Sequence, residues 1–313
     1  MDLKKIAEEI REILEEKRKE LELSFLEENH LYFMKDVDGK HRNDFPSVSK
    51  VLKKFYEPFD AEGIAYKKAG GDLKEMHRLL EEWKSSGDYA SNMGSRTHFY
   101  LETETINRNG GYKEVREPNY ECDIFQQATS DSMIRAGKRY LDLCEKRNLV
   151  LLDTEMVLGH PELGYTGQPD KVWLTVNATG DNFGILITDW KTNKEKNFKK
   201  NDFTKPMYHP FSDYPSTALG HYYLQLPLYG KLLLKMLEGT KYQDIQLLGC
   251  IVVLLKESSD YEEFRVPKPV IKTIFDMDVK EYLDWQFKTK NYFVHMKYPE
   301  ILDITNIDSW KEN

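Results

Sequence analysis

The sequence predicts an α/β or α+β fold in which helices flank a mixed central sheet. Apolar runs with strand character occur at residues 149–158, 165–175, 184–190 and 245–255, and segments with helical periodicity lie before, between and after them. This order of elements is typical of a layered fold built around one sheet. A chain of 313 residues, 40% of them hydrophobic, is also long enough to bury a large core.

The segments before the sheet are expected to be mainly helical. Residues 1–23 place apolar side chains on one side and Glu/Lys pairs on the other, which predicts an amphipathic helix. The Asp38-Gly39 turn predicts a hairpin between residues 30–36 and 41–46, and Ser47 is expected to cap the next helix. Further helices are predicted at residues 61–84, 94–106 and 121–147.

Turn residues and apolar runs predict the rest of the chain. A turn-rich stretch at residues 177–182 predicts that the strands on either side of it pair as a hairpin. A helix is expected at about residues 218–237, where Pro227 predicts a kink or a new start, and another at about 277–292. The apolar run Leu247 to Leu255 is about half the length of a membrane span and predicts a central strand.

Composition argues against several classes of protein. The net charge of −8 argues against DNA binding by bulk charge alone. The three cysteines, Cys122, Cys144 and Cys250, lack metal-ligand spacing, so we expect no zinc site, no iron–sulfur cluster and no disulfide framework. The charged N-terminus does not resemble a signal peptide. These features predict an intracellular, cytoplasmic protein with no membrane span.

Two carboxylates and one lysine form the most informative pattern in the chain. The segment Gly167-Gln-Pro-Asp170 is followed by Asp189-Trp190-Lys191 at the end of an apolar strand. Because side chains alternate along a strand, Asp189 and Lys191 share one face and Trp190 points to the other. The predicted hairpin places Asp170 near Asp189, and two close carboxylates repel each other unless a cation lies between them. Oxygen ligands of this kind suit Mg²⁺ or Mn²⁺.

Three further patterns each allow two interpretations. His98 and Glu102 lie four residues apart, as do Gln225 and Tyr229, so each pair shares a helix face. These pairs are candidate site residues, but taken alone each pattern favours the simpler interpretation, a surface His–Glu pair and an ordinary packing helix. A run of lysines after the acidic strand predicts either a solvated loop or a phosphate-binding rim. It consists of Lys191, Lys194, Lys196, Lys199 and Lys200.

The site candidates occur in the order His98, Asp170, Asp189-x-Lys191 and Gln225-x-x-x-Tyr229. This order resembles the PD-(D/E)XK nuclease superfamily and is most similar to its RecB-like exonuclease branch. The resemblance covers about residues 44 to 255 and begins with the segment Pro46-Ser-Val-Ser. It implies a restriction-endonuclease-like core with helical additions at both ends. The expected divisions are an N-terminal helical region with a hairpin at 1–93, the nuclease core at 94–256, and a C-terminal helical extension packed on the core at 257–313.

The resemblance also implies a metal centre. Asp170 and Asp189 would be the carboxylate ligands, and His98 and the backbone carbonyl of Trp190 would be further ligands. Lys191 would orient or activate the attacking water, or stabilise charge on the phosphate.

Four more positions acquire expected catalytic or supporting roles by the same resemblance. Gln225 and Tyr229 would support the site and contact the DNA backbone. Glu155 resembles an acidic residue on the first core strand, and Glu102 would be a partner of His98. The sequence departs from the usual pattern at Pro169, which precedes Asp170, and at Pro227.

The function implied by the resemblance is that of a Mg²⁺- or Mn²⁺-dependent deoxyribonuclease without an iron–sulfur cluster. The leading expectation is an exonuclease that hydrolyses phosphodiester bonds in single strands or at duplex ends, in recombination, repair or phage DNA processing. A structure-specific endonuclease of the same fold and a DNA-binding module without catalysis are the alternatives. No ATP-binding loop occurs in the sequence, so a helicase partner would be a separate chain.

Overall fold

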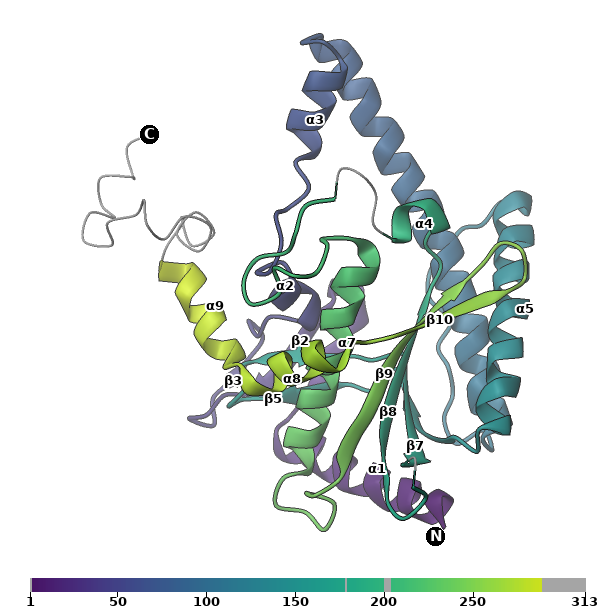
Figure 1. Cartoon of the computed structure of the whole chain (residues 1–313), viewed down its shortest axis with the longest axis vertical. Coiled ribbons are helices and arrows are strands. Elements are labelled where there is room, and N and C mark those ends of the chain that lie inside the picture. Colours follow the sequence, from purple (N-terminus) through teal and green to yellow (C-terminus); the bar gives the residue numbers. More distant parts are fainter. Residues whose placement is uncertain (1, 178, 200–203, 289–313) are drawn as a thin grey trace.

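A mixed sheet forms the centre of the protein, as predicted. The computed structural model describes residues 2–177, 179–199 and 204–288 (Figure 1). The five-stranded sheet has the order β10-β9-β8-β7-β4. Strands β8 and β9 are parallel, and the other neighbours are antiparallel. The strands are β4 (Val150–Thr154), β7 (Lys171–Val176), β8 (Phe183–Lys191), β9 (Gln246–Leu255) and β10 (Tyr261–Arg265).

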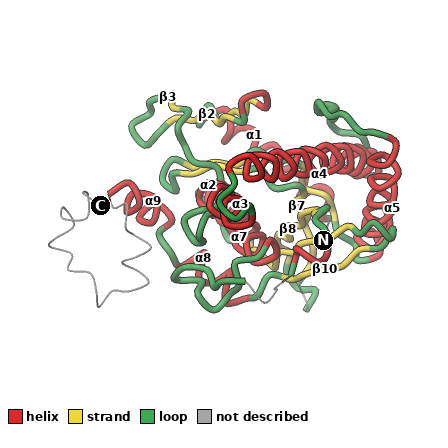
Figure 2. The backbone as a smooth tube through the Cα atoms, turned by 90° about the horizontal axis from the view of Figure 1, so that it is seen from above, coloured by secondary structure: helices red, strands yellow, loops and turns green. Residues whose placement is uncertain are grey.

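The sheet separates two hydrophobic cores, because alternate residues of each strand point to opposite faces. Val172 and Ile187 enter the larger core, whereas Trp173 and Trp190 enter the smaller one. Figures 1 and 2 show α7 and α5 on opposite sides of the sheet. The larger core includes residues of α1 (Leu3–Glu20), α2 (Val48–Leu52), α7 (Ala218–Leu237), α8 (Lys268–Asp276) and α9 (Val279–Lys288). The smaller core includes residues of α4 (Leu73–Arg108) and α5 (Ile124–Lys146).

Smaller elements surround this framework. A three-stranded sheet contains β1 (Ser24–Leu26), β2 (Leu31–Lys35) and β3 (His41–Arg42), and a hairpin contains β5 (Leu158–His160) and β6 (Tyr165–Gly167). A 3₁₀ turn, η1 (Glu27–Asn29), and the helices α3 (Ala61–Lys68) and α6 (Glu195–Phe198) complete the described elements. Helix α3 and the first half of α4 project from the body (Figure 1).

The strand ends that matter for function lie at one edge of the sheet. Strand β7 is antiparallel to both β4 and β8, and Lys171 at its start pairs with Thr154 on one side and Thr188 on the other. The chain therefore leaves β4, enters β7 and leaves β8 at the same end. This topology gathers residues 155, 170 and 189 in space, although they are far apart in the sequence.

Several predicted elements have different boundaries in the structure. The helices predicted at 61–84 and 94–106 are instead the short α3 and the single long α4, because Ser85, Ser86 and Gly87 do not interrupt the second helix. The strand predicted at 149–158 ends early because Glu155 has a left-handed φ of 42°. Gln168 and Pro169 likewise divide the strand predicted at 165–175 into β6 and β7.

Strands β1 and β10 and helix α8 are not predicted from the sequence. Of the helix predicted at 277–292, the described part is α9, and residues 289–292 lie outside the described residues.

The N-terminal segment and the sheet share one core. Ala7, Ile10 and Leu14 of α1 belong to the larger hydrophobic cluster. The Arg11 guanidinium donates to the backbone carbonyls of Leu151 and Leu152 at 3.3 Å, which ties α1 to β4. Helix α4 also runs through the boundary expected between residues 93 and 94. None of the helices in the described ranges combines the length and apolarity needed to cross a membrane.

The packing of α5 on α4 depends on Gly137, because a Cβ atom there would lie 2.4 Å from a methyl carbon of Leu101. We expect Gly137→Ala to lower the free energy of unfolding by about 1–3 kcal/mol through overpacking. Urea denaturation measures this change. As a control, Gly87→Ala on the exposed part of α4 meets nothing within 4 Å, and should raise stability by up to about 1 kcal/mol. Unchanged stability of the Gly137→Ala variant would contradict this packing.

Candidate metal centre

A polar cavity of about 210 Å³ lies at the end of the sheet where these strands meet. Segments from the start of α2, the β6–β7 connection, β8 and α7 contribute to its walls. Six residues predicted for the site line it: Glu155, Asp170, Asp189, Lys191, Gln225 and Tyr229. The structure therefore brings together residues from three strand ends and one helix.

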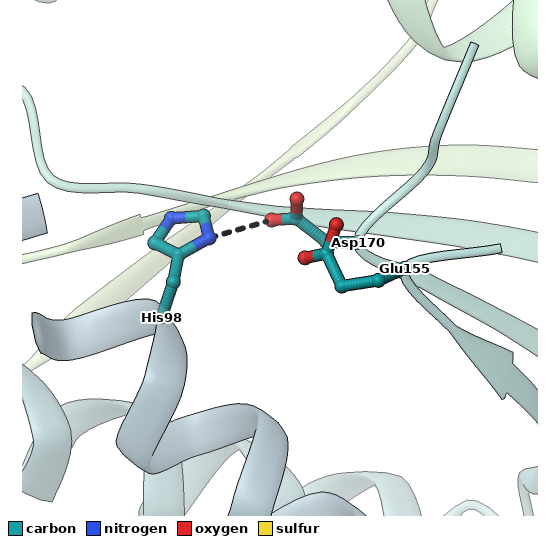
Figure 3. A group of neighbouring side chains, drawn as sticks. All are labelled: His98, Glu155 and Asp170. Atoms are coloured by element: carbon teal, nitrogen blue, oxygen red, sulfur yellow. Dashed lines mark ion pairs between the residues drawn. The ribbon is translucent and has the colours of Figure 1, made fainter. Parts of the chain in front are cut away.

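His98, Glu155 and Asp170 form a group able to hold a metal ion. One ligand atom from each residue lies within 4.8 Å of the other two. Figure 3 shows the imidazole of His98 extending from α4 toward the two carboxylates. Its Nδ1 atom lies 3.5 Å from Oδ2 of Asp170. A nitrogen and two carboxylate oxygens at these separations match the ligands that Mn²⁺ and Mg²⁺ accept.

The position of Glu155 depends on an unusual backbone conformation. Its φ of 42° lies in the left-handed region, which costs a non-glycine residue roughly 1–2 kcal/mol. The Glu155 amide donates to the carbonyl of Asp170 at 3.1 Å, and the Gln168 side chain donates to the Glu155 carbonyl at 3.0 Å. These bonds hold the chain as it leaves β4, so that the Glu155 carboxylate approaches Asp170. Local strain of this kind is common at functional sites.

Asp170 and Asp189 have different partners. One oxygen of Asp170 accepts the backbone N–H of Trp190 at 2.8 Å. Asp189 forms an ion pair with Lys191, whose ammonium also lies 4.3 Å from the ring centroid of Tyr222. Asp189 is therefore in the cavity, as predicted, but the group of candidate metal ligands found within the described part of the chain contains Glu155 in its place.

Burial and mutual repulsion shift the pKa values of these groups. Burial, with the charge of Asp170, raises the pKa of Asp189 to about 6. The same two effects raise the pKa of Glu155 well above its usual range. Burial also lowers the pKa of His98 to about 4, and Lys191 acts in the same direction. The imidazole is neutral at pH 7 and so has a lone pair for a metal, while a cation would relieve the repulsion between the carboxylates.

Gln225 and Tyr229 lie on one face of α7, as predicted. The helix continues through Pro227, and the side-chain amide of Gln225 donates to the Tyr229 hydroxyl at 2.8 Å. The Tyr229 ring needs space that only glycine leaves at position 167, where a Cβ atom would lie 2.5 Å from the ring. The glycine that begins the Gly167-x-x-Asp170 segment is thus explained by packing.

Glu102 lies outside the cavity lining and does not support the predicted role beside His98. Its carboxylate accepts a hydrogen bond from the Thr154 hydroxyl at 2.9 Å and lies 3.8 Å from the Lys113 ammonium. Lys113 also donates to the Thr154 carbonyl at 2.5 Å. These contacts hold Thr154, the last residue of β4, which directly precedes Glu155. The backbone of Trp190, predicted as a ligand, lies near the His98 imidazole and opposes the fall in the His98 pKa.

Sequence reasoning did not identify three polar residues at or near the centre. The Lys171 side chain is only 2% exposed, and its ammonium lies 4.3 Å from the ring centroid of Trp190. Burial lowers its pKa, although the charge of Asp170 opposes that shift. His30 and Tyr32 line the cavity from the small N-terminal sheet. Lys171 could have been noticed as a lysine within an apolar strand. No local sequence pattern connects residues 30–32 to the site.

The lysine run beyond β8 is partly neutralised. Lys199 forms an ion pair with Glu262 at 2.7 Å, and Glu195 within the same run forms one with Lys256 at 2.6 Å. Lys194 and Lys196 are exposed, and Lys200 lies outside the described residues. The local acidic residues reduce the positive charge that a phosphate-binding rim would need.

No protein-family model matches this sequence, and no curated protein matches it.

Replacing Glu155 with Gln should separate metal binding from folding. In EDTA at pH 7 we expect the variant to be more stable than the wild type by about 1 kcal/mol, because a half-buried acid beside other carboxylates is removed. The raised pKa means that folded Glu155 keeps a proton that the unfolded chain releases above its usual pKa of 4.5. Wild-type stability therefore falls as pH rises from this value, and the difference between the proteins should vanish near pH 4.

Thermal unfolding with Mn²⁺ completes this test. At a concentration of 100 times Kd, Mn²⁺ should stabilise the wild type by about 2.7 kcal/mol and the Glu155→Gln variant much less. Glu81→Gln is the matched control, because Glu81 is exposed on α4 and does not line the cavity, so its loss should preserve the Mn²⁺ response. An equal response in the Glu155→Gln variant would refute the assignment of Glu155.

Proposed function

We propose that this protein is a Mg²⁺- or Mn²⁺-dependent nuclease that hydrolyses phosphodiester bonds in DNA. One observation carries the proposal: Glu155 and Asp170 share one cavity with the ion pair of Asp189 and Lys191. A ring nitrogen of His98 lies within 4.8 Å of both carboxylates, so the three can hold one metal ion. Carboxylates and a neutral imidazole suit a hard divalent cation, and a fixed ammonium suits a phosphate anion. The resemblance of the sequence order to RecB-like nucleases supports the same conclusion.

The protein groups have separable tasks in this proposal. His98, Glu155 and Asp170 would hold the metal, which when bound lowers the pKa of water and offsets the charge of the phosphate. Lys191 acts as a cation rather than a base. Burial favours its neutral amine, but the charges of Asp189 and Asp170 outweigh burial and raise the pKa of Lys191. Its proton is retained at neutral pH, so it stabilises negative charge that develops on the phosphate oxygens.

The shape of the cavity favours the binding of a single DNA strand and cleavage that begins at an end. A volume of about 210 Å³ admits a phosphate with its neighbouring sugar, and the side chains of Asp170 and Asp189 at its base are only 11% and 2% exposed. A phosphodiester must enter this recess to reach them, which a free strand does more easily than a stacked duplex. We therefore propose an exonuclease that acts on single strands or opened duplex ends in recombination, repair or phage DNA processing. A helicase partner would be a separate chain.

The direct test is incubation with end-labelled linear DNA and closed circular single strands in Mg²⁺, Mn²⁺ or EDTA. We expect degradation of linear single strands in either metal, no degradation in EDTA, and intact circles. Cleavage of circles would identify the endonuclease alternative, and binding without cleavage in any metal would identify the catalytically silent alternative.

Lys191→Ala tests the division of tasks. We expect activity to fall by roughly 10²- to 10³-fold, as when one charge-stabilising group is lost, with Mn²⁺ affinity retained in calorimetry. The matched control is Lys194→Ala, an exposed lysine three residues later, which should keep wild-type activity. Loss of Mn²⁺ affinity in the Lys191→Ala variant would show that this lysine supports the metal centre instead.

A further inference from the structure

A second cavity lies next to the metal centre and differs from it in charge. It has a volume of about 780 Å³ and is formed by the β2–β3 hairpin, α2, the β5–β6 turn and the start of α9. We call it the α2 groove. The segment that begins α2 lines both cavities, with Ser47 and Ser49 facing the metal centre and Pro46 and Lys50 facing the groove. Gly164, just before β6, lines the groove, and Gly167, at the end of β6, lines the metal centre. An extended chain of this length places the two glycines roughly 10 Å apart.

The groove carries an excess of positive charge in a chain whose net charge is −8. Its acidic side chains and Arg42 lie at the β2–β3 hairpin, whereas its lysines lie on α2, directly after it and on α9. The charged residues are Arg42, Lys50, Lys53, Lys54 and Lys280 against Asp36, Asp38 and Asp44.

The acidic side chains are largely occupied at the hairpin itself. Arg42 forms ion pairs with Asp44 at 2.5 Å and with Asp36 at 3.6 Å, all within or just after the β2–β3 hairpin. Lys50 and Lys53 are exposed and form no ion pair with any residue in the described ranges. Their charges are therefore available to a ligand.

The start of α2 also offers hydroxyl groups in the direction of the metal centre. Ser47 occupies the N-cap position of α2, but its side chain forms no capping hydrogen bond. Ser49 is exposed at the cavity wall. A surface with hydroxyls in one cavity and lysines in the next matches the repeated phosphates of a nucleic-acid strand, which hydroxyl and ammonium groups commonly bind.

We propose that the α2 groove binds the phosphodiester backbone of the DNA strand whose cleaved bond lies at the metal centre, with Lys50 and Lys53 as the phosphate-binding residues. This inference rests on the proposed nuclease function and names the substrate path for it. It also assigns that path to α2 rather than to the lysine run after β8, where Glu195 and Glu262 form ion pairs with neighbouring lysines.

The test is the binding of a fluorescent 30-nucleotide single strand in EDTA, measured by anisotropy over a range of salt concentrations. The variant is Lys50→Glu/Lys53→Glu. Each phosphate contact contributes about 0.7 to the slope of log affinity against log salt for single strands, so the slope should decrease by roughly 1.4. Affinity at 0.1 M salt should fall by roughly 20-fold or more.

Two matched variants carry the same change in net charge. Lys4→Glu/Lys5→Glu alters exposed lysines at the start of α1, which lies well away from α2 (Figure 1). Lys194→Glu/Lys196→Glu alters the competing lysine run. Both should keep an affinity within a few-fold of the wild type. Equal losses in all three variants, a loss confined to the Lys194→Glu/Lys196→Glu protein, or no binding by the wild type would each overturn the proposal.

Cleavage assays separate this proposal from the proposed function. With Mn²⁺, the Lys50→Glu/Lys53→Glu variant should hydrolyse thymidine 5′-p-nitrophenyl phosphate at the wild-type rate, because this small ester needs only the metal centre. Its KM for the 30-nucleotide strand should rise by roughly 20-fold. If the wild type cleaves both substrates and the variant matches it on both, the groove assignment fails while the nuclease function stands. If the wild type cleaves neither but binding depends on Lys50 and Lys53, the nuclease function fails while the groove assignment stands.

Discussion

The repulsion between buried carboxylates at one end of the sheet is the constraint on which the rest of the structure depends. The antiparallel pairing of β7 with β4 and β8 brings Glu155, Asp170 and Asp189 to a single place. Burial makes their charges costly, since ionised groups away from water need a partner. Lys191 balances one of these charges through its ion pair with Asp189. The remaining carboxylates and the neutral imidazole of His98 form an arrangement that a divalent cation would complete.

Much of the surrounding structure holds this unfavourable arrangement in place. The polar network behind β4 fixes the end of that strand, directly before Glu155: Tyr112 donates to Asp153 at 2.9 Å, and Lys113 lies 3.1 Å from the same carboxylate. The packing of α4 on α5 fixes the helix that carries His98. Hydrogen bonds and tight packing of this kind allow a protein to keep strained, mutually repelling groups at a functional site at some cost in stability.

Charge in this protein is arranged locally and does not follow the net balance. An acidic chain is a poor general ligand for nucleic acid. Here Glu195 after β8 pairs with Lys256, and Asp36 and Asp44 at the β2–β3 hairpin pair with Arg42. Lys50 of α2 and Lys53 directly after it line the groove beside the metal centre. A substrate anion would thus meet positive charge at the entrance and carboxylates only where a metal ion offsets them. The net charge of a sequence gives little information about such a distribution, because it averages over distances much longer than a Debye length.

The sequence by itself determined the apolar strands, the long helix that carries Gln225 and Tyr229, and the approach of Asp170 to the strand of Asp189 and Lys191. These features depend on alternation, helical spacing and a short hairpin, which are local patterns. Only the tertiary structure placed Glu155 among the candidate metal ligands, because its position depends on a left-handed residue and on bonds from the β6–β7 connection. The tertiary structure also placed the Glu102 carboxylate, predicted as a partner of His98, against Thr154 at the end of β4, and it set α2 beside the cavity. Those outcomes depend on contacts between segments far apart in the chain, which no local pattern of residue types encodes.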